Sequence, residues 1–298
     1  MVTRIDVEIP AEGAVLSAWL YIPDNATKPL PTVTMCIGFA GIKDALLPEF
    51  ATAFTEAGFV TILHDHRGFG ASTGEPRYDV NPWQQIADWR RVISYLESRP
   101  EVDADRIGLW GTSYSGGHAL VLGATDRRLK AVVANAPFIS GHQDYLRRVL
   151  PEDHAAMEEW YNGDERAQVQ GAAPRVIAVA DKDPAVEALW HDAEIEAVYK
   201  AEIPGVTAPK NLVTLRSGRM IRMYEPGSYI SRVSPTPLLM VAAKQDTMTP
   251  TDAQLAAYEQ ALEPKKLQLL PGGHFAPYID EFELASSAAI EWFGTHLR

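Results

Sequence analysis

Short apolar segments alternate with amphipathic helical segments along most of this chain, and this alternation limits the folds open to it. Residues 3–9 and 14–22 alternate apolar and polar side chains, as half-buried antiparallel strands do. Apolar runs follow at residues 33–37, 60–63, 107–110, 131–134, 238–242 and 267–270. Helical patterns lie between most of them, at residues 48–57, 82–98, 114–124, 250–262 and 279–296. The sequence predicts an α/β fold whose mostly parallel, eight-stranded sheet is covered by helices on both faces.

The segment 138–233 breaks this alternation, because it separates two strands that elsewhere are joined by a single helix. A structureless loop of that length is implausible inside a compact domain, and helical patterns occur at residues 143–150, 152–161 and 184–199. We therefore expect an inserted helical cap, or lid, at residues 138–233. Residues 1–137 and 234–298 together would form the catalytic core.

Composition argues against several classes of protein. The 27 lysines and arginines face 39 aspartates and glutamates, a net charge of −12, and no basic run could follow a nucleic-acid backbone. No apolar stretch is long enough to cross a membrane, and the N-terminal residues lack the apolar core of a secretory signal. The single cysteine, Cys36, cannot form an internal disulfide. We expect a soluble, cytoplasmic protein without nucleic-acid or membrane partners, and we leave a homodimer open.

Ser113 lies in the sequence Gly111-Thr112-Ser113-Tyr114-Ser115, between an apolar strand and a helical segment. In a nucleophile elbow a serine sits on such a tight strand-to-helix turn, where small neighbours avoid crowding. The match to the pattern G-x-S-x-G is imperfect, because Ser115 occupies the second glycine position; for Ser115 itself we expect only a helix-start role. N–H groups at the start of the following helix favour an oxyanion near Ser113. We expect Ser113 to be a nucleophile for acyl transfer.

His274 and Asp246 follow the last two apolar strands, where they could complete a catalytic triad. His274 lies on a glycine-rich loop after the strand at 267–270, a position from which a base can reach the nucleophile. Asp246 lies just past the strand at 238–242, and the order Ser113, Asp246, His274 is one that serine hydrolases use. A turn or cap role for Asp246 is the alternative, and Asp252 is a weaker candidate for the acid. We expect structural or surface roles for the other histidines, His64, His66, His118, His142, His154, His191 and His296.

An oxyanion hole needs one N–H from the residue after the nucleophile, here Tyr114, and one from the loop after the third strand. That loop spans residues 37–44, and Phe39 is the predicted second donor, with Ala40 as the alternative. Cys36, just before the loop, is expected to be a buried structural thiol, since no base is suggested for it. The predicted chemistry requires neither a metal ion nor an organic cofactor.

With these residues in place, the chain resembles the α/β-hydrolase superfamily, in particular its dienelactone-hydrolase-like and S15 peptidase-like branch, over nearly all of residues 10–298. Residues 64–77 look like the Asp-x-Arg-Gly-x-Gly-x-Ser-x-Gly segment of that group, and the resemblance implies that Asp65 and Arg67 anchor loops near the site. The chain departs from the group at Ile37-Gly38, where His-Gly is frequent. Its cap segment matches only loosely, so the resemblance supports the chemistry better than the substrate.

The leading functional hypothesis is hydrolysis of a carboxylic ester, thioester or lactone with a small-molecule acyl group. His274 would take the proton of Ser113, an acyl-enzyme would form, and water activated by His274 would release the acid. The aromatic and methionine residues of the cap could contact the substrate or form the core of the cap itself. The predicted substrate contacts among them are Tyr145, Trp160, Trp190 and Met223.

Three alternatives remain open. An S15-like peptidase or amidase is suggested by the acidic residues at 152–165, which could bind a substrate amino group or could simply be a solvated helix face. The same triad could hydrolyse a C–C bond in a polyketide-like diketone held by the aromatic cap. A binding protein that retains the fold without catalysis is the third alternative, since a fold alone does not prove a function.

Overall fold

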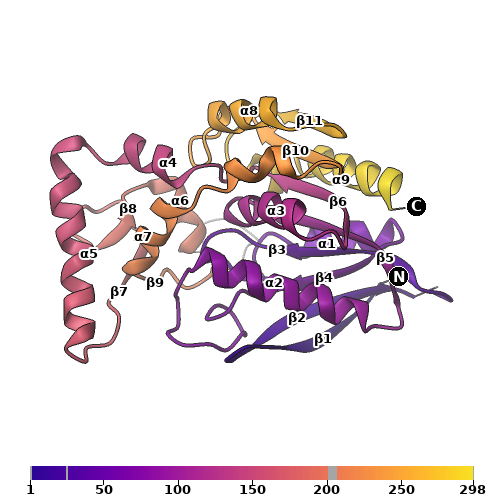
Figure 1. The fold of residues 1–298 in the computed structure, drawn as a ribbon, viewed down its shortest axis with the longest axis horizontal. Helices are drawn as coiled ribbons and strands as arrows, with labels where there is room; N and C mark the ends of the chain where they lie inside the picture. Colours follow the sequence, from indigo (N-terminus) through magenta and orange to yellow (C-terminus); the bar gives the residue numbers. More distant parts are fainter. Residues whose placement is uncertain (1, 25, 201–206, 298) are drawn as a thin grey trace.

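The computed structural model describes residues 2–24, 26–200 and 207–297. In these ranges, eight strands form one sheet in the order β1-β2-β4-β3-β5-β6-β10-β11 (Figure 1). The strands are β1 (Val2–Ala11), β2 (Ala14–Pro23), β3 (Leu30–Cys36), β4 (Val60–His64), β5 (Val102–Thr112), β6 (Leu129–Asn135), β10 (Leu238–Ala243) and β11 (Lys265–Leu270). β2 is antiparallel to β1 and to β4, whereas the other neighbouring pairs are parallel. The predicted mostly parallel, eight-stranded sheet is confirmed.

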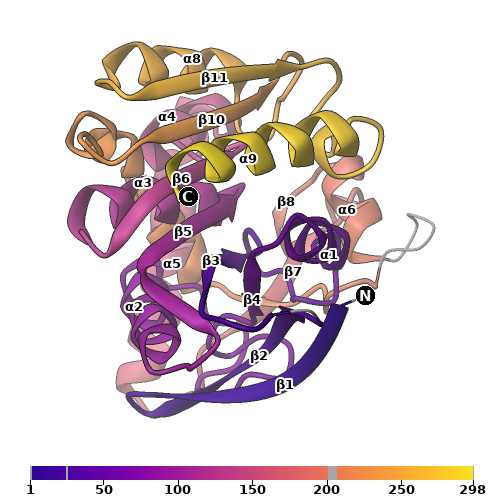
Figure 2. The ribbon, with the colours of Figure 1, turned by 90° about the vertical axis from the view of Figure 1, so that its right-hand side faces the viewer.

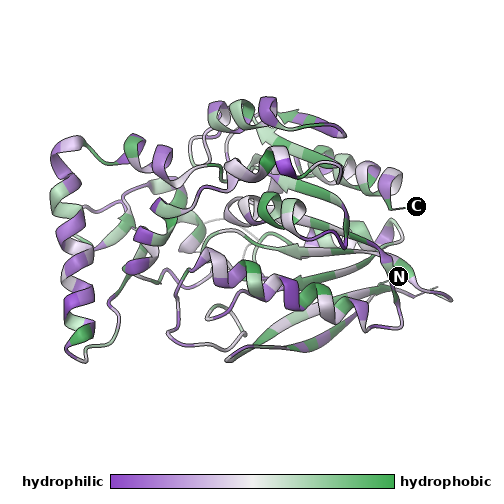
Figure 3. Cartoon of the chain, viewed as in Figure 1, coloured by the Kyte–Doolittle hydropathy of each residue, from purple (hydrophilic) through white to green (hydrophobic). Residues whose placement is uncertain are grey.

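The central strands are predominantly apolar because both of their faces are covered. Every residue of β4 and of β10 is buried. The outer strand β1 instead has exposed residues between half-buried ones, which is the alternation expected of a strand with one solvated face. In Figure 3 the central strands are mostly green or pale, whereas outer elements such as α5 are mixed green and purple.

Helices cover the two faces of the sheet, as predicted (Figure 2). Trp89 of α2 (Pro82–Glu97), Ala119 of α3 (Tyr114–Thr125) and Ala257 of α8 (Thr251–Gln260) belong to one buried apolar cluster. Phe50 of α1 (Pro48–Glu56) and Phe293 of α9 (Phe282–His296) belong to a second cluster, on the opposite face. None of the helices in the part of the chain that the structure describes is long and apolar enough to cross a membrane.

The cap segment (residues 138–233) lies beyond one end of the sheet, with α5 as its outermost element in Figure 1. Its helices are α4 (Gly141–Arg148), α5 (His154–Val169), α6 (Ala193–Tyr199) and α7 (Arg216–Met223), with 3-10 helices η1 (Pro151–Asp153) and η2 (Pro226–Arg232). The 3-10 helix η3 (Ala276–Tyr278) lies outside the cap segment, before α9. Because η2 packs against α3, the end of the cap segment already lies on the core. The division of the chain into core and cap stays a prediction.

A small sheet inside the cap segment was not predicted. Within the described ranges it has the order β8-β7-β9, with β7 (Val176–Ala180), β8 (Ala188–Trp190) and β9 (Val213–Thr214). The expected helix at 184–199 is therefore wrong in its first part, where β8 pairs with β7. The helix α6 begins only at Ala193, because the Asp192 side chain accepts hydrogen bonds from the N–H groups of Glu194 and Ile195.

Candidate active site

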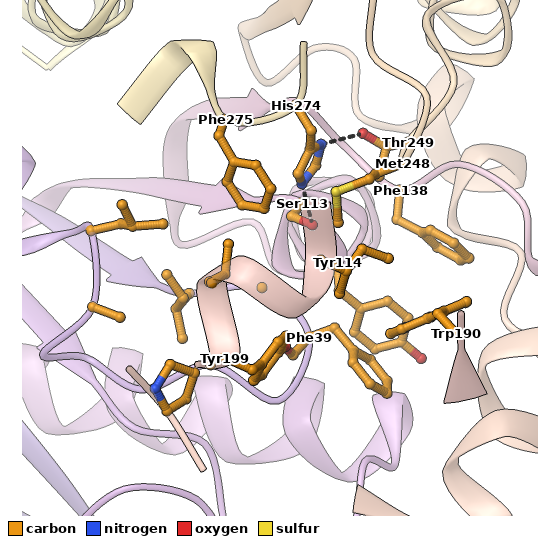
Figure 4. A pocket seen from close by; sticks show the side chains of 18 of the residues that line it. Phe39, Ser113, Tyr114, Phe138, Trp190, Tyr199, Met248, Thr249, His274 and Phe275 are labelled. Carbon is orange, nitrogen blue, oxygen red and sulfur yellow. Dashed lines mark hydrogen bonds between the residues drawn. The ribbon is translucent and has the colours of Figure 1, made fainter. Parts of the chain in front are cut away.

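Ser113, His274 and Asp246 come together at the carboxyl ends of three parallel strands. Ser113 follows β5, Asp246 follows β10, and His274 follows β11. Nε2 of His274 lies 3.1 Å from Oγ of Ser113, and Nδ1 of His274 lies 2.8 Å from Oδ2 of Asp246. Figure 4 shows the His274 ring directly above the Ser113 hydroxyl. Since Nδ1 donates its proton to the carboxylate, Nε2 carries the lone pair that can accept the serine proton.

The turn at Ser113 has the backbone strain expected of a nucleophile elbow. Ser113 has φ 55° and ψ −122°, an uncommon conformation for a residue with a side chain. Two glycines make room for it. A Cβ on Gly111 would lie 2.1 Å from the carbonyl oxygen of Ser115, and a Cβ on Gly38 would lie 2.7 Å from Cβ of Ser113. The small residues of the motif are therefore required by close backbone approach.

Ser115, which replaces the second glycine of the motif, has more than a helix-start role. Its hydroxyl is fully buried and donates a hydrogen bond to the carbonyl oxygen of Ile37, at the start of the loop after β3. The hydroxyl oxygen of Ser115 also lies 2.9 Å from Nε2 of His66. Ser115 thus joins the nucleophile helix to the loop that holds the predicted second oxyanion donor. This role cannot be recognised from the motif, because the motif specifies only a glycine at the position of Ser115.

Thr249 and Met248, which the sequence analysis did not single out, hold the carboxylate of Asp246. The backbone N–H groups of Met248 and Thr249 each donate to Oδ1 of Asp246 at 2.9 Å, and the Thr249 hydroxyl donates to Oδ2 at 2.8 Å. Burial raises the pKa of the Asp246 carboxyl, but His274 and these hydrogen bonds outweigh burial and hold that pKa below its usual value. The carboxylate is therefore ionised at neutral pH, as an orienting partner for His274 must be.

Phe39 and Tyr114, the predicted oxyanion donors, both lie beside Ser113 in the same pocket (Figure 4). Within the described residues, neither backbone N–H has a hydrogen-bond acceptor, so both are free to bind a substrate oxygen. The Phe39 ring packs edge-on against Tyr114 and Trp190, with ring centroids 5.5 and 5.0 Å away. The alternative donor, Ala40, has a φ of +48°. Which of the two N–H groups serves stays a prediction.

The catalytic pocket, the cavity that opens beside Ser113, has mostly apolar walls. The core contributes Ile37, Leu46 and Phe275, and the cap segment contributes Phe138, Ile195 and Val198. Pockets with such walls and few polar groups bind largely apolar ligands. The wall also contains the ion pair of Asp144 and Arg148, in which Nε of Arg148 lies 2.8 Å from Oδ1 of Asp144.

Of the four predicted substrate contacts in the cap segment, only Trp190 lines the catalytic pocket. Tyr145 and Trp160 instead line the cap cavity, a separate, partly open hollow between α4, α5, β8 and α7. Met223 lines neither space and is 59% exposed. The catalytic pocket and the cap cavity adjoin, because the residues common to both walls are Asp144, Arg148, Trp190 and Ile221.

The acidic residues at 152–165 do not line the catalytic pocket. Three of the six carboxylates pair with arginines instead. Glu158 pairs with Arg219 and Arg222, Glu165 also pairs with Arg219, and Glu159 pairs with Arg166. The ion pairs of Glu158 and Glu165 join α5 to α7.

A buried cluster of Cys36, His64 and His66 lies beneath the loop after β3. Their potential ligand atoms all lie within 4.8 Å of one another, and His66 Nε2 lies 3.2 Å from Cys36 Sγ. Burial lowers the pKa of His64 well below its usual value and that of His66 to about 4, and it raises the pKa of the Cys36 thiol. The two rings and the thiol are therefore neutral at neutral pH in this environment.

Asp65 and Arg67 anchor loops near the site, as the resemblance implied. Asp65 accepts hydrogen bonds from the backbone N–H and the ammonium group of Lys43, at 2.6 and 2.7 Å. Lys43 belongs to the loop that contains Phe39, so Asp65 ties that loop to the end of β4. Arg67 forms a two-pronged ion pair with Asp88 of α2, at 2.8 and 2.7 Å.

Comparisons with known proteins agree with this geometry. Residues 12–276 match the family model described as X-Pro dipeptidyl-peptidase (S15 family). Polyketide transferase grgF of Penicillium sp is 30% identical over 298 residues, which cover 99% of this chain and 97% of the relative. The quorum-quenching protein AidA of Acinetobacter baumannii is 28% identical, with 93% of this chain and 90% of the relative covered. A thiohydrolase of Eupenicillium brefeldianum is 29% identical, with 88% and 84% covered.

The solved structure of the α/β hydrolase GrgF from Penicillium sp. sh18 superposes on this chain with a TM-score of 0.87 and 29% identity, and 99% of each chain is covered. The chain therefore shares the fold of that α/β hydrolase over nearly its whole length. The chain belongs to the S15 family of α/β hydrolases.

Proposed function

We propose that this protein is a serine hydrolase that cleaves a carboxylic ester, thioester or lactone through an acyl-enzyme on Ser113. The observation that carries the proposal is the chain of two contacts from Asp246 through His274 to Ser113, at 2.8 and 3.1 Å, which opens into an apolar pocket. Such a chain is what acyl transfer requires.

His274 is the general base and then the general acid of the proposed reaction. Its Nε2 accepts the proton of Ser113 as Oγ attacks the carbonyl carbon, and Asp246 stabilises the imidazolium that forms. The developing oxyanion would be bound by the N–H of Tyr114 and an N–H of the loop after β3. His274 then protonates the leaving group, and a water molecule deprotonated by His274 releases the acid from Ser113.

The walls of the catalytic pocket favour a largely apolar acyl group. Side chains such as Phe138, Val198 and Phe275 offer no hydrogen bonds, so a chain of methylene groups or an aromatic ring would gain most from binding there. A relative named thiohydrolase supports a thioester as one substrate class. A relative named quorum-quenching protein is consistent with a hydrolase that acts on a small molecule.

Acyl transfer to an acceptor other than water is a second candidate, supported by the relatives named polyketide transferase. It uses the same acyl-enzyme, so only the second half of the reaction would differ. The peptidase alternative has less support from the structure. None of the acidic residues that suggested it lines the catalytic pocket, and Glu158, Glu159 and Glu165 pair with arginines.

The protein also fits a reducing compartment, so a cytoplasmic location belongs to the proposal. Its single cysteine, Cys36, is fully buried and forms no disulfide. A small-molecule acyl substrate is the proposed partner, and the homodimer stays a prediction.

A substrate panel with one substitution tests the proposal. We expect the wild-type protein to cleave nitrophenyl butyrate and an acyl thioester, and to leave an X-Pro anilide intact. Ser113→Ala should lose about 10³-fold or more in kcat, whereas Ser98→Ala, an exposed serine on the far side of α2, should keep full activity. Full activity of Ser113→Ala would contradict the proposal, and cleavage of the anilide alone would favour a peptidase.

A further inference from the structure

The loop after β3 is held by hydrogen bonds to three successive carbonyl groups. Ser115 donates to the carbonyl oxygen of Ile37. The N–H of Gly41 lies 3.4 Å from the carbonyl oxygen of Gly38, which is a weaker contact. The third contact comes from the cap segment, where the hydroxyl of Tyr199 donates to the carbonyl oxygen of Phe39 at 2.6 Å.

The third contact matters because a peptide unit is planar. The C=O of Phe39 and the N–H of Ala40 belong to one peptide unit and point in opposite directions. A hydrogen bond to the carbonyl therefore fixes the direction of that N–H, and it also restricts the rotation of the neighbouring unit that carries the N–H of Phe39. Both candidate oxyanion donors are thus oriented by the contact with Tyr199.

The loop needs such a contact to keep its conformation. Ala40 has a φ of +48°, a region that residues other than glycine rarely adopt and that persists only when surrounding contacts enforce it. The aromatic ring of Phe39 also contacts the cap segment, because Trp190 of β8 packs edge-on against it at 5.0 Å. Tyr199 and Trp190 both belong to the cap segment, whereas Phe39 belongs to the core.

We propose that Tyr199 is a positioning residue for catalysis, which orients the oxyanion-binding N–H groups through the carbonyl of Phe39. The inference rests on the proposed function. It implies that the helix α6 of the cap segment completes the oxyanion hole, in addition to forming a wall of the catalytic pocket. The oxyanion exists only in the transition state and in the tetrahedral intermediate, so Tyr199 should affect kcat rather than KM.

A purely structural role for Tyr199 would give a different result. If the hydroxyl only fastened α6 to the core, its removal would loosen the pocket wall, and substrate binding would weaken along with turnover. The ratio of the effects on kcat and KM therefore separates the two roles. An inhibitor that forms an oxyanion on the enzyme, such as an alkyl trifluoromethyl ketone, gives an independent measure, because its affinity depends on the same N–H groups.

The test compares Tyr199→Phe with Tyr229→Phe. Tyr229 is a half-buried tyrosine of η2 that has no hydrogen-bond partner among the described residues, so its substitution is a matched control. For Tyr199→Phe on nitrophenyl butyrate we expect kcat to fall about ten-fold or more, with KM within about two-fold of wild type. The inhibition constant of the trifluoromethyl ketone should rise by the same factor as kcat/KM falls. Tyr229→Phe should match wild type in all three values.

Two outcomes would overturn the inference, namely a kcat for Tyr199→Phe equal to that of Tyr229→Phe, or a loss in which KM rises as much as kcat falls. Both are distinct from failure of the proposed function, which would appear as equal activity of wild type and Ser113→Ala. Should the ester not be turned over, the rate of labelling by a fluorophosphonate gives the same comparison, since its phosphoryl oxygen needs the same N–H groups. A wild-type protein that neither cleaves nor labels would overturn both.

Discussion

The hydroxyl of Thr249 lies 2.8 Å from Oδ2 of Asp246, the carboxylate oxygen that also accepts the Nδ1 hydrogen of His274. The same hydroxyl lies 3.0 Å from the carbonyl oxygen of Ala136, at the end of β6. Thr249 therefore fixes the carboxylate relative to the sheet. The orientation of His274 depends in turn on that carboxylate.

Replacement of Thr249 by valine, which has the same shape, tests this role. We expect Thr249→Val to lower kcat about ten-fold, because the carboxylate loses one of the contacts that hold it. The free energy of unfolding should fall by about 1.5–3 kcal/mol, the usual worth of a hydrogen bond to a charged group. Enzyme assays and urea denaturation measure the two effects. Thr295→Val, at an exposed position on α9, is the control, and equal kcat values for the two variants would refute the role.

Ser115 offers a test in which the motif and the structure predict opposite results. Ser115→Gly makes the sequence match G-x-S-x-G fully, so the motif predicts unchanged or improved activity. The structure predicts a loss, because the buried carbonyl of Ile37 and Nε2 of His66 each lose their contact with the hydroxyl. An unsatisfied buried polar group costs about 1–3 kcal/mol. We expect a lower melting temperature and a lower kcat than wild type, and a Ser115→Gly protein as active and stable as wild type would show that the contact is dispensable.

Because of its buried histidines, we expect the folded protein to lose stability in mild acid. Burial lowers the pKa of His66 to about 4 and lowers those of His64 and His118 well below their usual value. These rings stay neutral in the folded protein, whereas the unfolded chain binds protons below about pH 6.5. The unfolded state therefore binds more protons, and the free energy of unfolding decreases as the pH falls from about 6.5 towards 4, by up to about 1.4 kcal/mol per pH unit for each histidine.

Urea denaturation at pH 7, 6 and 5 measures this slope. Removal of one buried ring, in His66→Gln, should reduce the slope below that of wild type. A free energy of unfolding that does not change between pH 7 and pH 5 would contradict neutral burial of these rings.

We expect the side chain of Ile221 to limit the length of the acyl chain that the catalytic pocket accepts. Its side chain is buried and lines both the catalytic pocket and the cap cavity, so it forms part of the wall between them. Ile221→Ala should open this wall and let a longer chain enter the cap cavity. We expect the ratio of kcat/KM for nitrophenyl decanoate to that for nitrophenyl butyrate to rise about ten-fold. Ile279→Ala, 45% exposed and outside both walls, should leave the ratio unchanged. An unchanged ratio in Ile221→Ala would mean that the two spaces do not communicate through this wall.

The sequence predicted the sheet and the placement of the triad because both depend on local signals. Ser113, Asp246 and His274 each follow an apolar run directly, and the carboxyl ends of parallel strands meet at one edge of the sheet. Thr249 could have been found as well. It lies three residues after Asp246, at the distance from which an aspartate side chain accepts hydrogen bonds from its own turn.

The cap segment was predicted less well, because its contacts are distant in sequence. Tyr199 and Phe39 are 160 residues apart, and no local pattern indicates that they meet. Periodicity also does not tell which of two adjacent hollows an aromatic side chain faces, so it did not place Tyr145 and Trp160 in the cap cavity, and their contact with substrate stays a prediction. The strand β8 has only three residues and exists through its pairing with β7, so its sequence was taken for part of a helix.

The nucleophilic role of Ser113 is the central feature of the proposed reaction, and the mass of the modified protein tests it. After treatment of the folded protein with a fluorophosphonate, we expect one adduct per chain, located on the peptide that contains Ser113. We expect no adduct on Ser113→Ala. An adduct on another residue, or an active wild-type protein that remains unlabelled, would contradict the nucleophilic role of Ser113.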